Sequence, residues 1–204
     1  QTVAETVLKL NTSDEDILLL IGSDHGHETV AEVIDLENKL VEAGLKTDQN
    51  SKDVVVTSQG LSAFVYLASH QQEKLEDIAA FIADLNGVGK VYTGEELDRI
   101  GQKSGGALAI AVDAAKSEET NEYGIPGQSA AFANRFSMTL ETGKGEHGGL
   151  GKYEQNPFLM AIGGGFQPNT THDAETSAVD IAPTILRHLG LPAKNMDGQA
   201  LSLK

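Results

Sequence analysis

The stretch from Asp16 to His27 constrains the fold most, because it joins a short apolar run to side chains that can bind metal. The run from Ile17 to Ile21 is unbroken and ends at Gly22. Such a run is typical of a strand buried on both faces of a parallel sheet. A buried helix segment gives the same pattern, but the run is short for a helix. We therefore expect a buried strand at residues 17–21.

The residues directly after this run are Asp24, His25, Gly26 and His27. Ligand-binding groups in open α/β sheets collect at the carboxyl ends of strands. Carboxylate oxygen and imidazole nitrogen are suitable ligands for zinc or manganese. Gly26 is expected to let the backbone turn sharply. A solvated turn capped by Asp24 would give the same pattern, so these residues alone leave both interpretations open.

The composition limits the class of protein and its partners. The chain has 204 residues, of which 40% are hydrophobic, enough for one domain with a substantial core. Its net charge of −15 argues against a nucleic-acid polymer and against an anionic membrane surface. It does not exclude an anionic substrate, because metal ions supply local positive charge. We also expect no membrane segment, since no apolar stretch reaches the roughly 20 residues of a transmembrane helix.

The chain contains no cysteine. Disulfides, thiolate zinc sites and a cysteine nucleophile are therefore excluded. A cysteine-free chain tolerates either redox environment, so a periplasmic or secreted location and a cytoplasmic one both stay open.

Strand-like and helix-like segments alternate through the chain, which predicts an α/β fold. Helices are expected at residues 3–10, 36–43, 71–86, 95–100 and 180–190. Strands are expected at residues 33–36, 54–57, 63–67, 90–92, 107–112, 136–140 and 158–162. The strands at 54–57 and 63–67 are expected to pair as a hairpin around Gly60, and residues 116–128 are expected to form an exposed loop. In the last helix, Asp180 is the predicted N-cap, and Ile181, Ile185 and Leu189 are predicted to face the core.

A second group of residues with chemical potential lies at Gly143–Gly151, around His147. Glycine occupies five of these nine positions, which indicates unusual backbone angles or the close approach of another group. Such a loop can present an imidazole without obstruction. Taken alone, a surface loop with a solvated His147 explains the pattern better.

These stretches occur in an order that resembles a known family, over about Val3 to Leu201. The motifs are, in order, Ser23–Gly26, Gly145–Gly149, Pro157, Asp180–Leu186, Leu189–Pro192 and Met196–Gly198. The set resembles the C-terminal half of the type I phosphodiesterase/nucleotide pyrophosphatase family, in the alkaline phosphatase superfamily. The resemblance implies an alkaline-phosphatase-like mixed, largely parallel sheet flanked by helices. Residues 1–204 would then be the C-terminal portion of a single catalytic domain.

The resemblance also implies a two-metal hydrolase of small-molecule phosphoesters. The metals are usually zinc, with manganese or another divalent ion as an alternative. Asp24 and His25 match the residues that bind one metal, and His147 matches a ligand of the other. His27 stands where the family often has a residue that is not a ligand, so we expect it beside the metal shell or on the substrate side. The segment starting at Asp180 is structural in the family.

The resemblance also identifies residues that this chain lacks. The family's threonine or serine nucleophile, an aspartate ligand and an Asp-x-x-x-His pair all lie upstream of the Ser-Asp-His-Gly motif. Since only about half of the ligands remain, we expect weak metal binding, no catalytic residue and no turnover. If the chain stands alone, an exposed sheet edge predicts self-association or binding of a complementary N-terminal fragment.

Two other functions stay open. The related chemistries of phosphonoacetate hydrolases, sulfatases and phosphomutases use the same fold, and fold does not decide the substrate. A non-catalytic binding or structural module is the other alternative, since half of the expected site is missing.

Overall fold

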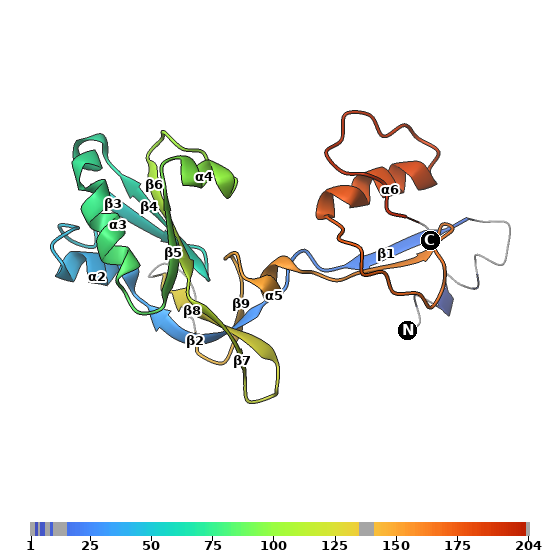
Figure 1. Cartoon of the computed structure of the whole chain (residues 1–204), viewed down its shortest axis with the longest axis horizontal. Helices are drawn as coiled ribbons and strands as arrows, with labels where there is room; N and C mark the ends of the chain where they lie inside the picture. Colours follow the sequence, from blue (N-terminus) through green and yellow to red (C-terminus); the bar gives the residue numbers. More distant parts are fainter. Residues whose placement is uncertain (1–2, 4, 7–8, 10–15, 135–140, 203–204) are drawn as a thin grey trace. The chain divides into compact units, whose positions relative to one another are not determined.

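A computed structural model describes residues 3, 5, 6, 9, 16–134 and 141–202 of the chain. The predicted strand at 136–140 lies outside these ranges, as do Val7, Leu8 and Leu10 of the predicted first helix. The chain divides into two compact units, coloured along the sequence in Figure 1. We call Gln1–Asp24 with Pro157–Lys204 the terminal unit, and His25–Asn156 the central unit. The prediction of a single catalytic domain over 1–204 stays a prediction. No helix in the described part of the chain has the length and apolar character needed to cross a bilayer.

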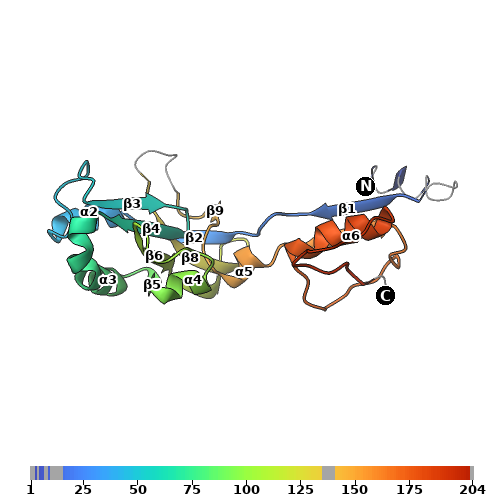
Figure 2. The same ribbon diagram turned by 90° about the horizontal axis from the view of Figure 1, so that it is seen from above.

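The central unit contains a four-stranded antiparallel sheet with the strand order β3-β4-β6-β5. These strands are β3 (Val54–Ser58), β4 (Ser62–Leu67), β5 (Val88–Thr93) and β6 (Leu108–Ala114). The helical segments of this region are α2 (Leu36–Glu42), the 3-10 helix η1 (Ser69–Lys74), α3 (Leu75–Ala83) and α4 (Glu95–Arg99). Each of them contacts a strand of this sheet, α3 and α4 both packing against β5 (Figure 2).

The second sheet of the central unit has the order β7-β8-β2-β9. Its strands are β2 (Glu28–Ile34), β7 (Lys116–Thr120), β8 (Pro126–Phe132) and the two-residue β9 (Gly145–Glu146). β2 pairs in parallel with β8 on one side and antiparallel with β9 on the other. The segments before β2 and after β9 carry the three histidines described below.

The core of the central unit is formed by apolar side chains from both sheets and from helices α2 and α3. Ile78 and Ile82, one helical turn apart on α3, are fully buried, as expected for the core-facing side of an amphipathic helix. Phe132 at the end of β8 is also fully buried. Burial of each such side chain contributes about 1.5–3 kcal/mol to the stability of the central unit.

The terminal unit pairs β1 (Leu18–Gly22) with β10 (Leu159–Gly163) and contains η2 (Ala178–Asp180) and α6 (Ile181–His188). The Asp180 carboxylate accepts hydrogen bonds from the amides of Ser177 and Gln199, both at 2.8 Å. The buried Thr184 hydroxyl donates to the Asp180 carbonyl and accepts from the Leu201 amide. The start of α6 therefore holds the C-terminal segment, which agrees with the structural role expected for this motif.

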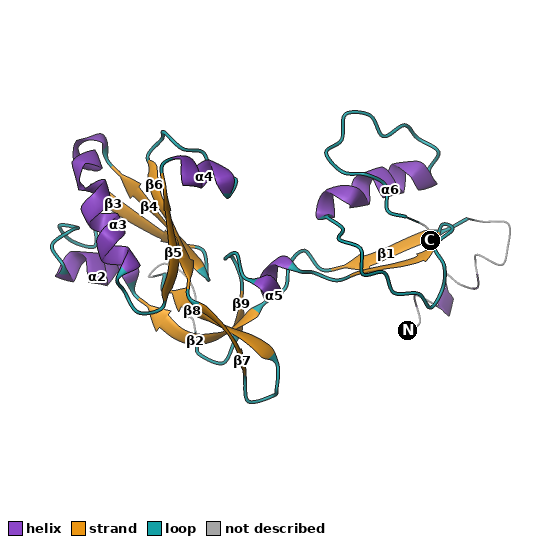
Figure 3. Ribbon diagram, viewed as in Figure 1, coloured by secondary structure: helices purple, strands orange, loops and turns teal. Residues whose placement is uncertain are grey.

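The α/β class, with sheets flanked by helices, is confirmed (Figure 3). The expectation of a largely parallel sheet is wrong for the described strands, where β2–β8 is the one parallel pair. An apolar run indicates that a strand is buried, but it does not encode the direction of its neighbour. β1 itself is half-buried rather than buried, because β10 covers it on one edge in a two-stranded sheet.

Two further expectations are corrected. Residues 116–128 are not a loop: β7 and β8 form a hairpin whose turn is closed by the Asn121 amide bonding to the Ile125 carbonyl at 2.9 Å. The polar composition of β7 reflects an exposed edge strand. Ile185 on α6 and Leu189 directly after it are 40% and 60% exposed and do not face a core.

Candidate metal centre

Three imidazoles meet in the central unit, and they come from segments far apart in the sequence. The rings of His25 and His147 are stacked, with centroids 3.7 Å apart and planes at 18°. His27 lies edge-on to both, at 5.1 Å from His25 and 5.4 Å from His147. Each ring offers a nitrogen, and the three nitrogens lie within 4.8 Å of one another. His25 and His147 are half-buried and His27 is exposed, so the cluster is accessible from solvent.

Helix α5 (Lys152–Gln155) fixes the segment that carries His25 and His27. The Gly26 amide donates to the Glu154 carbonyl at 2.9 Å. A Cβ on Gly26 would lie 1.9 Å from the Tyr153 carbonyl oxygen, so only glycine allows this approach. The predicted sharp turn is not the reason for this glycine, because its backbone is outside the positive-φ region.

Strand pairing places His147 against this segment. In the antiparallel β2–β9 pair, Glu28 is opposite Glu146 and Thr29 is opposite Gly145. The next pair along this register is His27 and His147. Residues two apart in an extended chain share a face, so His25 is on the same side as His27.

The turn between β3 and β4 holds the backbone of the His147 segment. The Leu61 amide donates to the His147 carbonyl at 2.9 Å, and the Ser62 hydroxyl donates to the Gly148 carbonyl at 2.6 Å. Gly60 in this turn has φ +76°, and a Cβ on it would lie 2.2 Å from the His147 carbonyl oxygen. This turn therefore requires glycine both for its backbone angle and for the approach of His147.

A buried ionic network joins the strand after His27 to the loop after His147. Lys116 Nζ lies 3.2 Å from Asp113 Oδ1, 3.2 Å from Glu154 Oε1 and 3.7 Å from Glu28 Oε2. Glu28 and Glu154 are buried. Burial raises the pKa of the Glu28 carboxyl, and the Lys116 ammonium acts in the opposite direction. Removing the lysine would leave three carboxylates facing one another with little solvent.

The glycines after His147 let the backbone approach these carboxylates. The amides of Gly149 and Gly151 donate to Glu154 at 2.7 and 2.8 Å, and the Leu150 amide donates to Asp113 at 3.0 Å. A Cβ on Gly151 would lie 2.1 Å from a Glu28 oxygen. The close approach of another group explains Gly149 and Gly151, and the positive φ angles of Gly143 (+80°) and Gly148 (+103°) confirm the unusual backbone angles that were also expected.

A carboxylate also lies next to His147. Glu146 Oε1 accepts the His147 amide at 3.0 Å and lies 3.9 Å from its Nε2. A carboxylate orients a metal-binding imidazole by accepting its ring N–H, but 3.9 Å is beyond hydrogen-bonding distance, so Glu146 holds the backbone of His147 rather than its ring.

The structure thus brings together two of the three residues expected to bind metal, His25 and His147. Asp24 is exposed and directly precedes His25, but it belongs to the terminal unit, and its role as a ligand stays a prediction. His27, expected outside the metal shell, lies with the other two imidazoles. The sequence signal for this is the His-x-His spacing next to a strand, since alternation puts both rings on one face.

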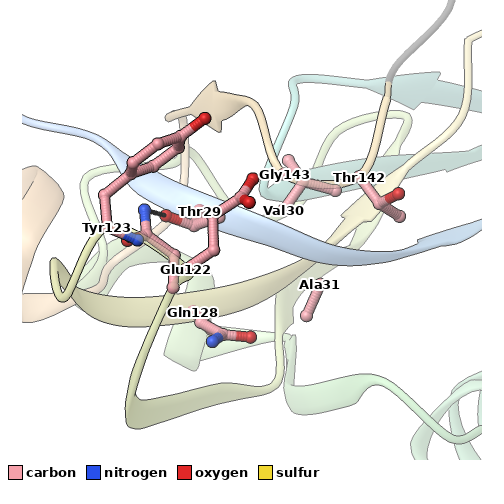
Figure 4. Close-up of a pocket in the computed structure, with 9 residues that line it drawn as sticks. Thr29, Val30, Ala31, Glu122, Tyr123, Gln128, Thr142 and Gly143 are labelled. Atoms are coloured by element: carbon pink, nitrogen blue, oxygen red, sulfur yellow. Dashed lines mark hydrogen bonds between the residues drawn. The ribbon is translucent and has the colours of Figure 1, made fainter.

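A separate pocket of about 250 Å³ lies beside β2 and the β7–β8 turn (Figure 4). In this pocket the side-chain amide of Asn121 donates a hydrogen bond to the Thr29 hydroxyl at 3.1 Å. Its lining residues are Thr29, Val30, Ala31, Asn121, Glu122, Tyr123, Gln128, Thr142 and Gly143. None of the three clustered histidines is among them, so it is not the cavity of the histidine cluster.

The sequence matches no protein-family model and no curated protein. The structure is similar to that of murine ectonucleotide pyrophosphatase/phosphodiesterase 5, with a TM-score of 0.64, 20% identity and 95% of this chain covered. The chain has an alkaline-phosphatase-like fold. It spans 46% of the murine protein's solved chain, less than half of that structure. The resemblance inferred from the motifs is therefore confirmed at the level of the fold.

A phosphonoacetate hydrolase from Sinorhizobium meliloti 1021 is less similar. Its complexes with phosphonoformate and with phosphonoacetate each match with a TM-score of 0.49 and 16% identity. Each match covers 83% of this chain and 40% of the other.

Proposed function

We propose that this chain is the C-terminal portion of a two-metal phosphoester hydrolase of the phosphodiesterase/nucleotide pyrophosphatase type. The observation that carries the proposal is the contact between His25 and His147, whose rings stack at 3.7 Å. These are the two histidines that the motifs identify as ligands. A chance surface arrangement would not be expected to join the same two residues.

The donor chemistry fits zinc. Imidazole nitrogen is a common zinc ligand, and an aspartate directly before His25 adds a carboxylate oxygen. In this proposal Asp24 and His25 hold one ion and His147 holds the other. The ions would provide the positive charge that an anionic phosphoester needs in a chain with a net charge of −15. The side chains of this chain bind and orient; none acts as acid, base or nucleophile.

The chain alone is expected to be inactive. The nucleophile and the remaining ligands of the family lie upstream of the Ser-Asp-His-Gly motif, in a part of the fold that these 204 residues do not include. A two-metal site with three of its protein ligands cannot hold both ions tightly, since a tetrahedral zinc site needs three or four donors.

The exposed apolar side chains of the terminal unit support the proposal that part of the fold is missing. Phe158, Met160 and Leu189 are 55%, 51% and 60% exposed, and large apolar side chains at this exposure commonly mark an interaction surface. Self-association or a complementary N-terminal fragment would cover them. Light scattering that finds only monomer at high concentration would contradict self-association.

The test is an assay with bis(p-nitrophenyl) phosphate of the polypeptide encoded by the whole reading frame. We expect zinc-dependent hydrolysis that is lost in Asp24→Ala and His147→Ala and kept in His172→Ala, a histidine exposed on the terminal unit. The 204-residue chain should show no turnover. A reading frame limited to these residues would contradict the proposal, as would activity that survives both substitutions. A parallel panel of phosphonates and sulfate esters decides between the related chemistries.

A further inference from the structure

The three histidines form a set that is complete within the central unit. His25, His27 and His147 all belong to residues 25–156, and each offers a nitrogen within 4.8 Å of the other two. Three imidazoles with an open fourth position are an established ligand set for zinc. The cluster therefore does not need Asp24 or an upstream residue to provide a minimal metal shell.

The spacing is close to what one ion requires. With a Zn–N length of about 2.1 Å, two nitrogens on one tetrahedral ion lie about 3.4 Å apart. The nitrogens here lie within 4.8 Å of one another, so they approach by up to about 1.4 Å when one tetrahedral ion binds all three. The exposed His27 ring can make this movement without disturbing the core.

The surroundings of the rings favour binding. His25 Nδ1 lies 2.9 Å from the Gly26 carbonyl oxygen, which can only accept, so Nδ1 carries the proton. In the neutral ring the lone pair is then on Nε2, the usual arrangement for a metal-binding histidine. The backbone of His147 is held by the Leu61 amide at 2.9 Å, and the Glu146 carboxylate lies 3.9 Å from its ring. The His25 ring and the His147 backbone are thus held in position, and the two stacked rings, whose planes differ by 18°, rotate apart when their nitrogens converge on one ion.

We propose that His25, His27 and His147 bind a single divalent transition ion of the zinc type as a three-imidazole site in the central unit. This site differs from the two-metal centre of the proposed function, in which His25 and His147 hold different ions and His27 holds none. It does not rest on that function, because the ion would bind whether or not any longer polypeptide is a hydrolase.

The test is a titration of the chelator-treated 204-residue chain with Zn²⁺ by calorimetry and with Co²⁺ by visible absorption. We expect one ion per chain and a Co²⁺ spectrum of a four-coordinate nitrogen site. His27→Ala should weaken Zn²⁺ binding by more than the ~10–100-fold that loss of an outer-shell partner costs. His147→Ala should weaken it to a similar extent.

One substitution serves as the matched control, and the metal stoichiometry separates this site from the two-metal centre. His70→Ala removes an exposed histidine from the same unit, one that lies 3.2 Å from Asp53, and it should leave the affinity unchanged. Two ions bound to the unmodified chain, one of them lost in Asp24→Ala, would support the two-metal arrangement and overturn the three-imidazole site. Unchanged binding in His27→Ala, or equal loss in His70→Ala, would overturn the three-imidazole site.

An NMR measurement makes the result independent of variant folding. Of the six histidines in the chain, three should show imidazole shifts on addition of one equivalent of Zn²⁺ to the unmodified protein. Shifts confined to His25 and His147, or to other histidines, would overturn the site. His27→Gln, which keeps a polar side chain at this exposed position, repeats the titration if the alanine variant unfolds.

Discussion

Gly60→Ala tests whether the β3–β4 turn sets the position of His147. Gly60 has φ +76°, and alanine in this region costs roughly 1–2 kcal/mol. Its Cβ would also lie 2.2 Å from the His147 carbonyl oxygen and 3.0 Å from Glu146 Cγ. Forcing an atom into packed structure costs about 1–3 kcal/mol more, so the total is about 2–5 kcal/mol.

Gly101→Ala is the matched control for this substitution. Gly101 lies in the same unit and has the same φ of +76°, but a Cβ added there would have nothing within 4 Å. It therefore carries only the backbone cost of roughly 1–2 kcal/mol. The difference between the two variants isolates the contact with His147.

The assay is urea unfolding followed by tyrosine fluorescence. The chain has no tryptophan, and its four tyrosines, at 66, 92, 123 and 153, all lie in the central unit. The signal thus reports the unit that contains the turn. If Gly60→Ala loses no more stability than Gly101→Ala, the turn does not constrain His147 and this part of the site description is wrong.

Three further predictions follow from the same contacts. Lys116→Met should lower the free energy of unfolding by about 3 kcal/mol, the lower end for breaking a buried ion pair, because the Lys116 side chain is 19% exposed. Adding Glu28→Gln should recover part of this loss. Lys90→Met, at a side chain that is 58% exposed, should cost less than about 1 kcal/mol in the same urea assay. In Gly26→Ala the added Cβ would lie 1.9 Å from the Tyr153 carbonyl oxygen, whereas in Gly106→Ala it would have nothing within 4 Å. Gly26→Ala should therefore lower the urea midpoint more than Gly106→Ala, and equal midpoints would contradict the contact. Hydrogen bonds from the backbone amides of Gln199 and Ser177 lower the pKa of the Asp180 carboxyl. The stability that the Asp180 carboxylate contributes is therefore present above the pKa of the unfolded chain and is lost as pH falls through the pKa of the folded one. Hydrogen exchange of these two amides should accelerate, relative to other amides of the terminal unit, below that pH in the wild type and at every pH in Asp180→Asn.

The elements predicted correctly are those whose signals are local. Val54–Ser58 and Ser62–Leu67 are β-branched or alternating segments around a glycine, and they form the expected hairpin. The helix expected at residues 71–86 is present as α3, although the preceding segment, Ser69–Lys74, is a 3-10 helix. Each signal lies within a few residues of the structure that it predicts.

The errors concern contacts between distant residues. Lys116 opens a polar stretch, which predicts an exposed loop, yet its ammonium faces Glu28, Asp113 and Glu154. Those partners come from three separate segments, and no local pattern pairs them with the lysine. The direction of strand pairing cannot be predicted for the same reason, since an apolar run does not identify its neighbour.

In the candidate site, too, local sequence signals are predictive and contacts between distant residues are not. His25 and His147 can be selected from the motifs, because their order along the chain matches a family pattern. The position of His27 depends on the register of β2 with the two-residue strand β9, in which Glu28 faces Glu146. The His-x-His spacing indicates that His27 shares a face with His25, but nothing in the composition of Gly145–Glu146 predicts the strand that places His147 beside them.

The measurement that tests the metal centre most directly is anomalous diffraction at the zinc edge from crystals of the chain with Zn²⁺. We predict that an imidazole nitrogen of His25 and one of His147 each lie about 2.0–2.1 Å from an anomalous zinc peak. Zinc bound elsewhere, with these two rings left uncoordinated at saturating Zn²⁺, would contradict the assignment.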